Sequence, residues 1–305
     1  MNILTASNIH KSYGQFKALN NINLEVPQGS IFGLLGPNGA GKTTFIRIIT
    51  QIIIADQGEI LINGKSLNID HIKEIGYLPE ERGLYKKMKV GEHLLYLAQL
   101  KGLSKNEAME QIKTWFKKFE IAGWWNKKVE DLSKGMQQKV QFIATVLHDP
   151  KLIILDEPFS GFDPINVNII KDEILNFARE GKTIILSTHR MESVEELCDY
   201  IALINKSEKI LEGSKKDIKE NYKTNTFEVG HKTPVSYLDS GFEIVRSEEL
   251  ENDFHTTSIR ILNGKGPNEL LKSLIDSVEV HSFIEKIPTM NEIFISTVQG
   301  GGNHE

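Results

Sequence analysis

The sequence of 305 residues contains a single cysteine, Cys198, and no long run of apolar residues. One cysteine cannot build a disulfide framework, which suits a protein of the reducing cytoplasm. No apolar run approaches the roughly 18 residues that a membrane-spanning helix needs. The first residues also lack the charged and apolar regions of a signal peptide. We therefore expect any role at a membrane to come through a partner chain.

An excess of positive charge is also lacking. The chain carries 36 Lys and Arg against 41 Asp and Glu, which gives a formal net charge of −5. Without a broad basic field we predict no nucleic-acid partner. With 40% hydrophobic and 25% charged residues, the composition is that of an ordinary soluble globular protein. A chain of this length can form two domains.

The chain does contain a Gly-rich segment with specific spacing. Residues 36–43 read Gly-Pro-Asn-Gly-Ala-Gly-Lys-Thr and fill the phosphate-loop pattern, between a short apolar run at 30–35 and a helical apolar pattern at 45–53. The glycines let the backbone approach an anion closely. Lys42 can bridge the β- and γ-phosphates, and Thr43 can bind Mg²⁺. The glycine spacing does not fit a dinucleotide-binding loop.

Two further apolar runs end in polar side chains. Residues 151–155 precede Asp156 and Glu157, and residues 183–188 precede His189. Continuous apolar runs are typical of buried parallel strands. Ligands of open α/β sheets bind at the carboxyl ends of such strands. We therefore predict that these three side chains lie near the nucleotide.

The remaining patterns predict the subdomains of residues 1–215. The N-terminal part favours β-structure, with strands at 3–9 and 22–26 and a hairpin at 58–64. Tyr13, between the first strands, either packs locally or stacks on a base. Residues from about 88 to 148 show amphipathic helical spacing, which indicates a helical insertion.

Near residue 220 the composition changes. We interpret the polar, charged residues 216–224 as a linker and residues 300–305 as a loose tail. Residues 225–299 between them predict a small α+β domain. Its expected strands are 226–229, 242–245, 256–262 and 278–284, and its expected helices are 270–277 and 291–298.

The order of these motifs resembles that of the nucleotide-binding subunit of an ATP-binding-cassette (ABC) transporter. Its diagnostic element is the Leu-Ser-x-Gly stretch, which appears here within residues 132–139 as Leu-Ser-Lys-Gly-Met-Gln-Gln-Lys. The resemblance covers residues 1 to about 215. It implies an α/β phosphate-loop NTPase core with an antiparallel β subdomain and a helical insertion, followed here by the small α+β domain.

The resemblance also implies roles for individual residues. Tyr13 would stack on adenine, Glu157 would act as general base, and His189 and Lys42 would stabilise charge on the γ-phosphate. Mg²⁺ would lie near Thr43, Asp156 and Glu80, where Glu80 replaces the Gln that is usual in the family. The nucleotide would be bound by the loop residues Gly36, Pro37, Asn38, Gly39, Ala40, Gly41, Lys42, Thr43 and Thr44.

A second copy of the chain would complete each ATP site. The signature residues Ser133, Lys134, Gly135 and Met136 would contact the ATP held by the partner, and Asp163 would link the two sites. Lys134 and Met136 replace the usual Gly and Gln, and Phe162 replaces the usual Leu before Asp163. The resemblance thus implies a homodimer closed by two ATP molecules.

One branch of the family is especially similar. Residues 76–85, 132–139 and 288–294 are similar to the ATPase subunits of bacterial sodium-extrusion exporters and their drug- and peptide-resistance relatives. This implies an ATPase on the cytoplasmic face of the cell membrane that drives an integral-membrane permease. A soluble ABC-type ATPase acting on ribosomes or nucleic acid is the alternative, which the single cassette and the acidic balance disfavour. Glu157 and His189 disfavour an ATP-binding switch without turnover.

Overall fold

The computed structural model describes residues 1–305 apart from 82, 161–163, 236–237, 251–252 and 301–305. The chain forms two compact units, residues 1–215 and residues 216–305. Among the helices of the described residues, none combines the length and the apolarity that crossing a membrane requires.

A six-stranded sheet forms the centre of the first unit. From edge to edge its strands are β10 (Glu208–Ser214), β9 (Tyr200–Asn205), β3 (Ile31–Leu35), β8 (Thr183–Thr188), β7 (Leu152–Asp156) and β6 (Ile75–Leu78). All are parallel except β10. Every residue of β3, β7 and β8 is buried, as their continuous apolar runs predicted. The residues that follow these three strands meet at one edge of the sheet.

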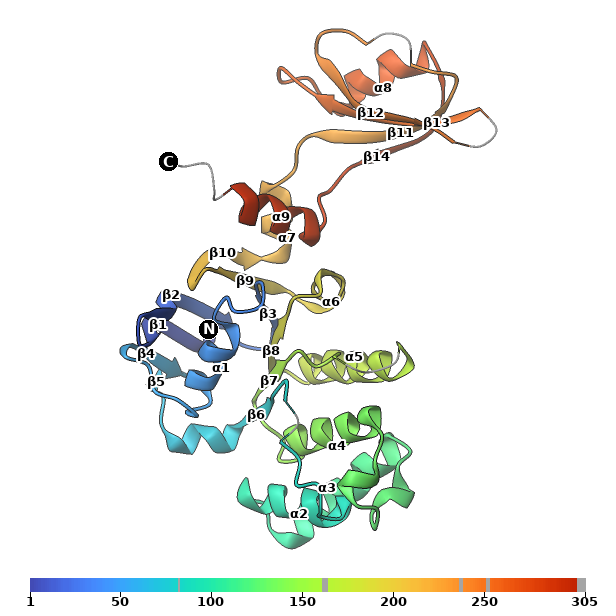
Figure 1. Ribbon diagram of the computed structural model, residues 1–305. Helices are drawn as coiled ribbons and strands as arrows, with labels where there is room; N and C mark the ends of the chain where they lie inside the picture. Colours follow the sequence, from blue (N-terminus) through green and yellow to red (C-terminus); the bar gives the residue numbers. More distant parts are fainter. Residues whose placement is uncertain (82, 161–163, 236–237, 251–252, 301–305) are drawn as a thin grey trace. The chain divides into compact units, whose positions relative to one another are not determined.

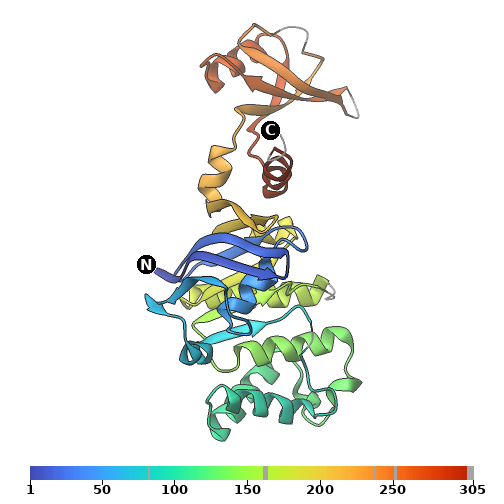
Figure 2. The same ribbon diagram turned by 60° about the vertical axis from the view of Figure 1, so that its left-hand side comes forward.

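An antiparallel sheet and one helix cover one side of the central sheet (Figure 1). Figure 2 views the first unit more from the side of these strands. Apolar side chains of both sheets and of the helix, among them Leu24, Phe45 and Ile154, form one buried cluster. The strands, in spatial order, are β2 (Phe16–Pro27), β1 (Asn2–Tyr13), β4 (Gln57–Ile62) and β5 (Lys65–Ser66), and the helix is α1 (Lys42–Ile49).

Helices dominate the rest of the first unit. Packed rings of Trp115, Phe119, Phe142 and Phe177 connect the helical insertion to the core, with centroids 5.6–6.4 Å apart. The helices are η1 (Ile69–Glu74), α2 (Val90–Leu100), α3 (Lys105–Lys118), η2 (Ala122–Trp124), η3 (Val129–Asp131), α4 (Lys134–Val146), α5 (Pro164–Arg179) and α6 (Met191–Leu197). Figure 1 shows α5 and α6 on the side of the central sheet opposite α1.

The second unit contains an antiparallel sheet with order β12 (Phe242–Glu249), β13 (Phe254–Ile261), β11 (Thr226–Lys232) and β14 (Glu279–Glu285). Helix α8 (Pro267–Ile275) covers one face, where Leu270 and Leu274 join a cluster with Phe227, Val229 and Ile259. Two more helices, α7 (Lys215–Asn221) and α9 (Met290–Gly300), belong to the ends of this part of the chain.

The predicted α/β fold class, with its antiparallel sheet, helical insertion and C-terminal α+β domain, is confirmed. The expected linker at 216–224 stays a prediction, and helix α7 occupies its first part, up to residue 221. That helix has seven residues and one buried apolar side chain, Ile218, which is too little for a periodic signal. Helix α6, strand β10 and the first half of β2 were not predicted. In that half of β2, register shifts interrupt the alternation of apolar and polar residues.

Candidate functional site

The Gly-rich loop connects β3 to α1, as its spacing predicted. Gly36 has φ 148°, and a Cβ there would lie 2.1 Å from the carbonyl oxygen of Ile204. Gly41 has φ 116°, and its Cβ would lie 2.5 Å from the carbonyl oxygen of Ala18. Both contacts are with backbone that cannot swing aside. The loop can therefore take this curl only with glycine at these two positions.

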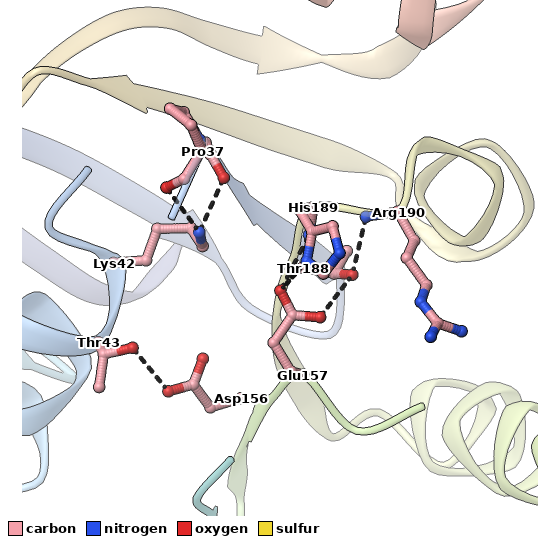
Figure 3. A network of polar contacts seen from close by, with 9 residues as sticks. Pro37, Lys42, Thr43, Asp156, Glu157, Thr188, His189 and Arg190 are labelled. Carbon is pink, nitrogen blue, oxygen red and sulfur yellow. Dashed lines mark hydrogen bonds and ion pairs between the residues drawn. The ribbon is translucent and has the colours of Figure 1, made fainter. Parts of the chain in front are cut away.

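Lys42 lies inside the curl of the loop. Its ammonium donates to the carbonyl oxygens of Gly36 at 2.7 Å and Pro37 at 3.2 Å (Figure 3). Burial lowers the pKa of Lys42, and the carboxylates of Glu157 and Asp156 oppose that shift. Because both of these hydrogen bonds go to neutral carbonyls, the buried ammonium is suited to receive an anion.

Thr43 and Asp156 form the second contact of the site. The Thr43 hydroxyl donates to Asp156 Oδ2 at 3.0 Å, across the gap between α1 and the end of β7 (Figure 3). Burial raises the pKa of the Asp156 carboxyl, and the hydrogen bond from Thr43 acts against it. A hydroxyl and a carboxylate are ligand types that Mg²⁺ takes. No cluster of three or more His, Cys, Asp or Glu in the described ranges could hold a metal by itself, so phosphate and water would complete the shell.

Glu157 follows β7 directly and is held by the end of β8. Its carboxylate accepts hydrogen bonds from the Thr188 hydroxyl at 3.3 Å and the His189 N–H at 3.1 Å, and His189 Nδ1 lies 2.6 Å from Oε1 (Figure 3). Glu157 has φ 49°, a left-handed conformation that costs about 1–2 kcal/mol for a residue with a Cβ. Its N–H donates to the Ser187 carbonyl at 2.9 Å, which fixes this backbone.

A cavity of about 370 Å³ brings nine of the predicted site residues together. Its wall contains three carboxylates and one lysine, together with the loop. Glu80, after β6, joins the site here, although its side chain is exposed. The lining residues are Phe16, Ala18, Asn38, Gly39, Gly41, Lys42, Thr43, Thr44, Glu80, Asp156 and Glu157. Gly36, Pro37 and Ala40 belong to the same loop behind this wall.

The aromatic wall of the cavity differs from the prediction. The described lining includes Phe16 and not Tyr13. The two residues pair across the β1–β2 hairpin, and both side chains are at least half exposed. Sequence reasoning selected Tyr13 and overlooked Phe16, whose only signal is its place directly across the turn. The stacking role of Tyr13 stays a prediction.

The signature residues lie outside the cavity wall. Ser133 caps α4, where its hydroxyl accepts the Met136 N–H at 3.3 Å. Ser133 and Lys134 are exposed, and a Cβ on Gly135 would meet nothing within 4 Å. Nothing described in this subunit therefore requires glycine at 135. Asp163 lies outside the described residues.

Comparison with known proteins identifies the family. The ABC transporter family model matches residues 19–160, and the model of the DrrA1-3-like ATP-binding protein C-terminal domain matches residues 213–298. The uncharacterized ABC transporter ATP-binding protein YhaQ of Bacillus subtilis (strain 168) is 40% identical over 296 residues, which are 97% of this chain and 98% of YhaQ. This chain belongs to the family of ABC transporter ATP-binding subunits. It is accordingly an ATPase that binds ATP.

Two further relatives match this subunit, one over nearly its whole length and one over about three quarters of it. The linearmycin resistance ATP-binding protein LnrL of the same B. subtilis strain is 30% identical, over 96% of this chain and 97% of LnrL. A solved structure of the ATP binding subunit of an ABC transporter is 29% identical with a TM-score of 0.68. It covers 72% of this ABC subunit and 93% of its own chain. The cassette fold is thus shared with solved relatives.

The close contact at Gly36 yields a testable prediction. We expect Gly36→Ala to weaken ATP binding by at least roughly 100-fold, because the loop must open to admit the methyl group. Gly64→Ala is the matched control, since Gly64 also has positive φ but a Cβ there meets nothing within 4 Å. Calorimetric titration with Mg²⁺-ATP measures both. Equal affinity in the two variants would contradict this account of the loop.

Proposed function

We propose that this subunit forms a homodimer around two ATP molecules and drives a separate integral-membrane permease as an exporter. The carrying observation is the cavity that gathers Lys42, Thr43, Asp156 and Glu157 at one sheet edge, with His189 bonded to Glu157. The whole-length similarity to LnrL, a linearmycin resistance ATP-binding protein, supports a drug as the cargo, and sodium ions or a peptide are the alternative cargoes. The subunit would work on the cytoplasmic face of a bacterial cell membrane, beside its permease.

The chemistry follows from how the side chains are held. Glu157 is the proposed general base: its carboxylate is fixed by β8 and can take a proton from a water that attacks the γ-phosphate. Lys42 would leave the loop carbonyls for the phosphate oxygens, where it stabilises transition-state charge. His189, whose side chain is 53% exposed and bonded to Glu157, would donate to the γ-phosphate. Thr43, Asp156 and Glu80 would hold Mg²⁺, which neutralises phosphate charge.

A second copy is proposed because all donor side chains in the described cavity lining come from the Gly-rich loop and the start of α1. The N-terminus of α4, a helix of 13 residues, is a separate anion-binding element that lies outside the cavity. The exposure of Ser133 and the free space at Gly135 support contact with the ATP of a partner subunit. Asp163 is proposed to connect the two sites across the dimer.

A groove of about 490 Å³ supports the permease proposal. It lies between the core and the helical insertion, and its wall includes the exposed Ile69 and Leu100. Tyr77 and Pro79 line this groove, and Glu80 lines the nucleotide cavity. A permease segment docked in the groove would thus touch the strand end that carries Glu80. We propose that this strand end passes a change of the bound nucleotide on to the permease.

The base assignment predicts the kinetics of Glu157→Gln. We expect kcat for ATP hydrolysis to fall roughly 10²–10⁴-fold while ATP affinity is retained, because the amide keeps the shape but cannot take the proton. Steady-state turnover and ATP titration separate the two effects. Glu110→Gln, on the exposed face of α3, is the control and should be unchanged. Near-normal turnover of Glu157→Gln removes this residue from the base role.

The shared-site proposal predicts poisoning in trans. A chain with both Glu157→Gln and Ser133→Arg keeps its loop and its bound ATP but lacks the general base and a working signature. In large excess it should bring wild-type ATPase activity close to zero, because each wild-type loop then faces a blocked signature. Glu157→Gln alone keeps Ser133 and should inhibit less. If the double variant leaves wild-type turnover unchanged, each chain carries a complete site.

A further inference from the structure

A second cavity lies within the unit of residues 216–305, far in the sequence from the residues of the ATP site. Its volume is about 520 Å³. Thr226, Ser258 and Arg260 line it, and they alternate along their strands with Phe227 and Ile259, which pack under α8. Alternation places the cavity on the sheet face opposite α8. The lining residues are Tyr222, Thr224, Thr226, Val245, Arg246, Ser258, Arg260, Lys286, Pro288, Glu292, Ile293, Ser296 and Thr297.

Strand register brings three cations to this face. Arg246 on β12 pairs with Ser258 on β13, and Arg260, two residues further, pairs with Thr226 on β11. Directly paired residues of antiparallel strands share a face. The backbone N–H of Lys286 donates to the Thr226 carbonyl at 2.8 Å, which places this third cation beside the same strand end.

Each of the three cations has a carboxylate partner, but these ion pairs are exposed or long. Arg260 pairs with Glu243 at 3.2 Å, with both side chains more than 40% exposed, and Arg246 pairs with the exposed Glu248. Exposed pairs of this kind contribute little energy and exchange readily. Glu292 is the only carboxylate among the described lining residues. Its Oε2 caps α9 by accepting from the Thr289 N–H at 2.8 Å and hydroxyl at 3.0 Å, and its Oε1 lies 3.9 Å from Lys286 Nζ, a long pair between half-exposed side chains.

Hydroxyl groups supply further donors around the cations. Thr224 bonds to Thr226 at 2.9 Å, and either hydroxyl of this pair can be the donor, so the pair can turn a proton toward an incoming oxygen. Tyr222 bonds to Thr297 at 3.0 Å, and the Thr297 hydroxyl donates to the Ile293 carbonyl at 2.7 Å. Val245 and Ile293 add apolar surface to the same wall. The cavity thus combines cationic forks, adaptable hydroxyls and an apolar patch.

We propose that this cavity binds a small organic anion that carries a phosphate or carboxylate group. Arginine guanidinium groups match these anions in bidentate geometry. The lining carries three positive charges against one negative charge, in a chain whose net charge is −5. The volume lies in the range of small-molecule sites. The anion is either free in solution or the headgroup of a membrane lipid, and it binds apart from the ATP site.

Binding of sn-glycerol 3-phosphate to the full chain, measured by calorimetry, tests the proposal. Arg246→Gln/Arg260→Gln should weaken it by about 10- to 100-fold, because two charge-assisted contacts are lost. Lys272→Gln, exposed on α8 on the opposite face of the sheet, is the control and should bind like the wild type. Any binding of sn-glycerol 3-phosphate at the Gly-rich loop should be equal in all three proteins, because none of the substitutions lies there.

Co-sedimentation with phosphatidylglycerol vesicles distinguishes the source of the anion. Arginine-dependent binding to vesicles alone identifies a lipid headgroup, and arginine-dependent binding of the free phosphate identifies a soluble ligand. Binding that is equal in all three proteins, or absent for both probes, overturns the proposal. The single variants Arg246→Gln and Arg260→Gln give the same comparison if the double variant does not fold, as judged by circular dichroism.

Discussion

The nucleotide site depends on one buried lysine placed among carboxylates. Lys42 is 6% exposed and rests on loop carbonyls, while Asp156 and Glu157 face the same cavity. Burying charges is costly unless each has a partner. Here the partners are a threonine hydroxyl for Asp156 and the end of β8 for Glu157. These bonds set the geometry before ATP arrives, which is the preorganisation that electrostatic catalysis requires.

The central sheet supplies that geometry at its carboxyl edge, and in the proposed cycle the strand next to the helical insertion passes the change of nucleotide state on to the permease. β6 ends at Leu78, and the next residues face two different spaces: Pro79 the groove and Glu80 the nucleotide cavity. Gln141 of α4 donates to the Pro79 carbonyl at 3.0 Å, which ties the helix with the signature residues to the same segment. Pro79 and Glu80 thus border the groove, the nucleotide cavity and the helix that carries the signature residues.

The features that could be predicted from the sequence are those that depend on the spacing of nearby residues. The phosphate loop, Asp156, Glu157 and His189 could be placed because each ends or follows a buried strand, and strand ends of a parallel sheet converge. Phe16 was missed because nothing in its local pattern says which hairpin side chain faces the loop. Arg246 and Arg260 were missed for another reason. They are 14 residues apart and reach the same face only through the register of β12 and β13, which shifts between Ile244 and Arg246. Resemblance, rather than spacing, supplied the signature residues.

The central claim is that each chain holds half of an ATP site. Light scattering of the Glu157→Gln variant, with and without Mg²⁺-ATP, tests it most directly, because slow hydrolysis preserves the bound state. The account predicts a mass near the 34.5 kDa of one chain without nucleotide, and a doubling of that mass with ATP. A mass that stays at one chain while ATP binds at full stoichiometry would contradict the claim.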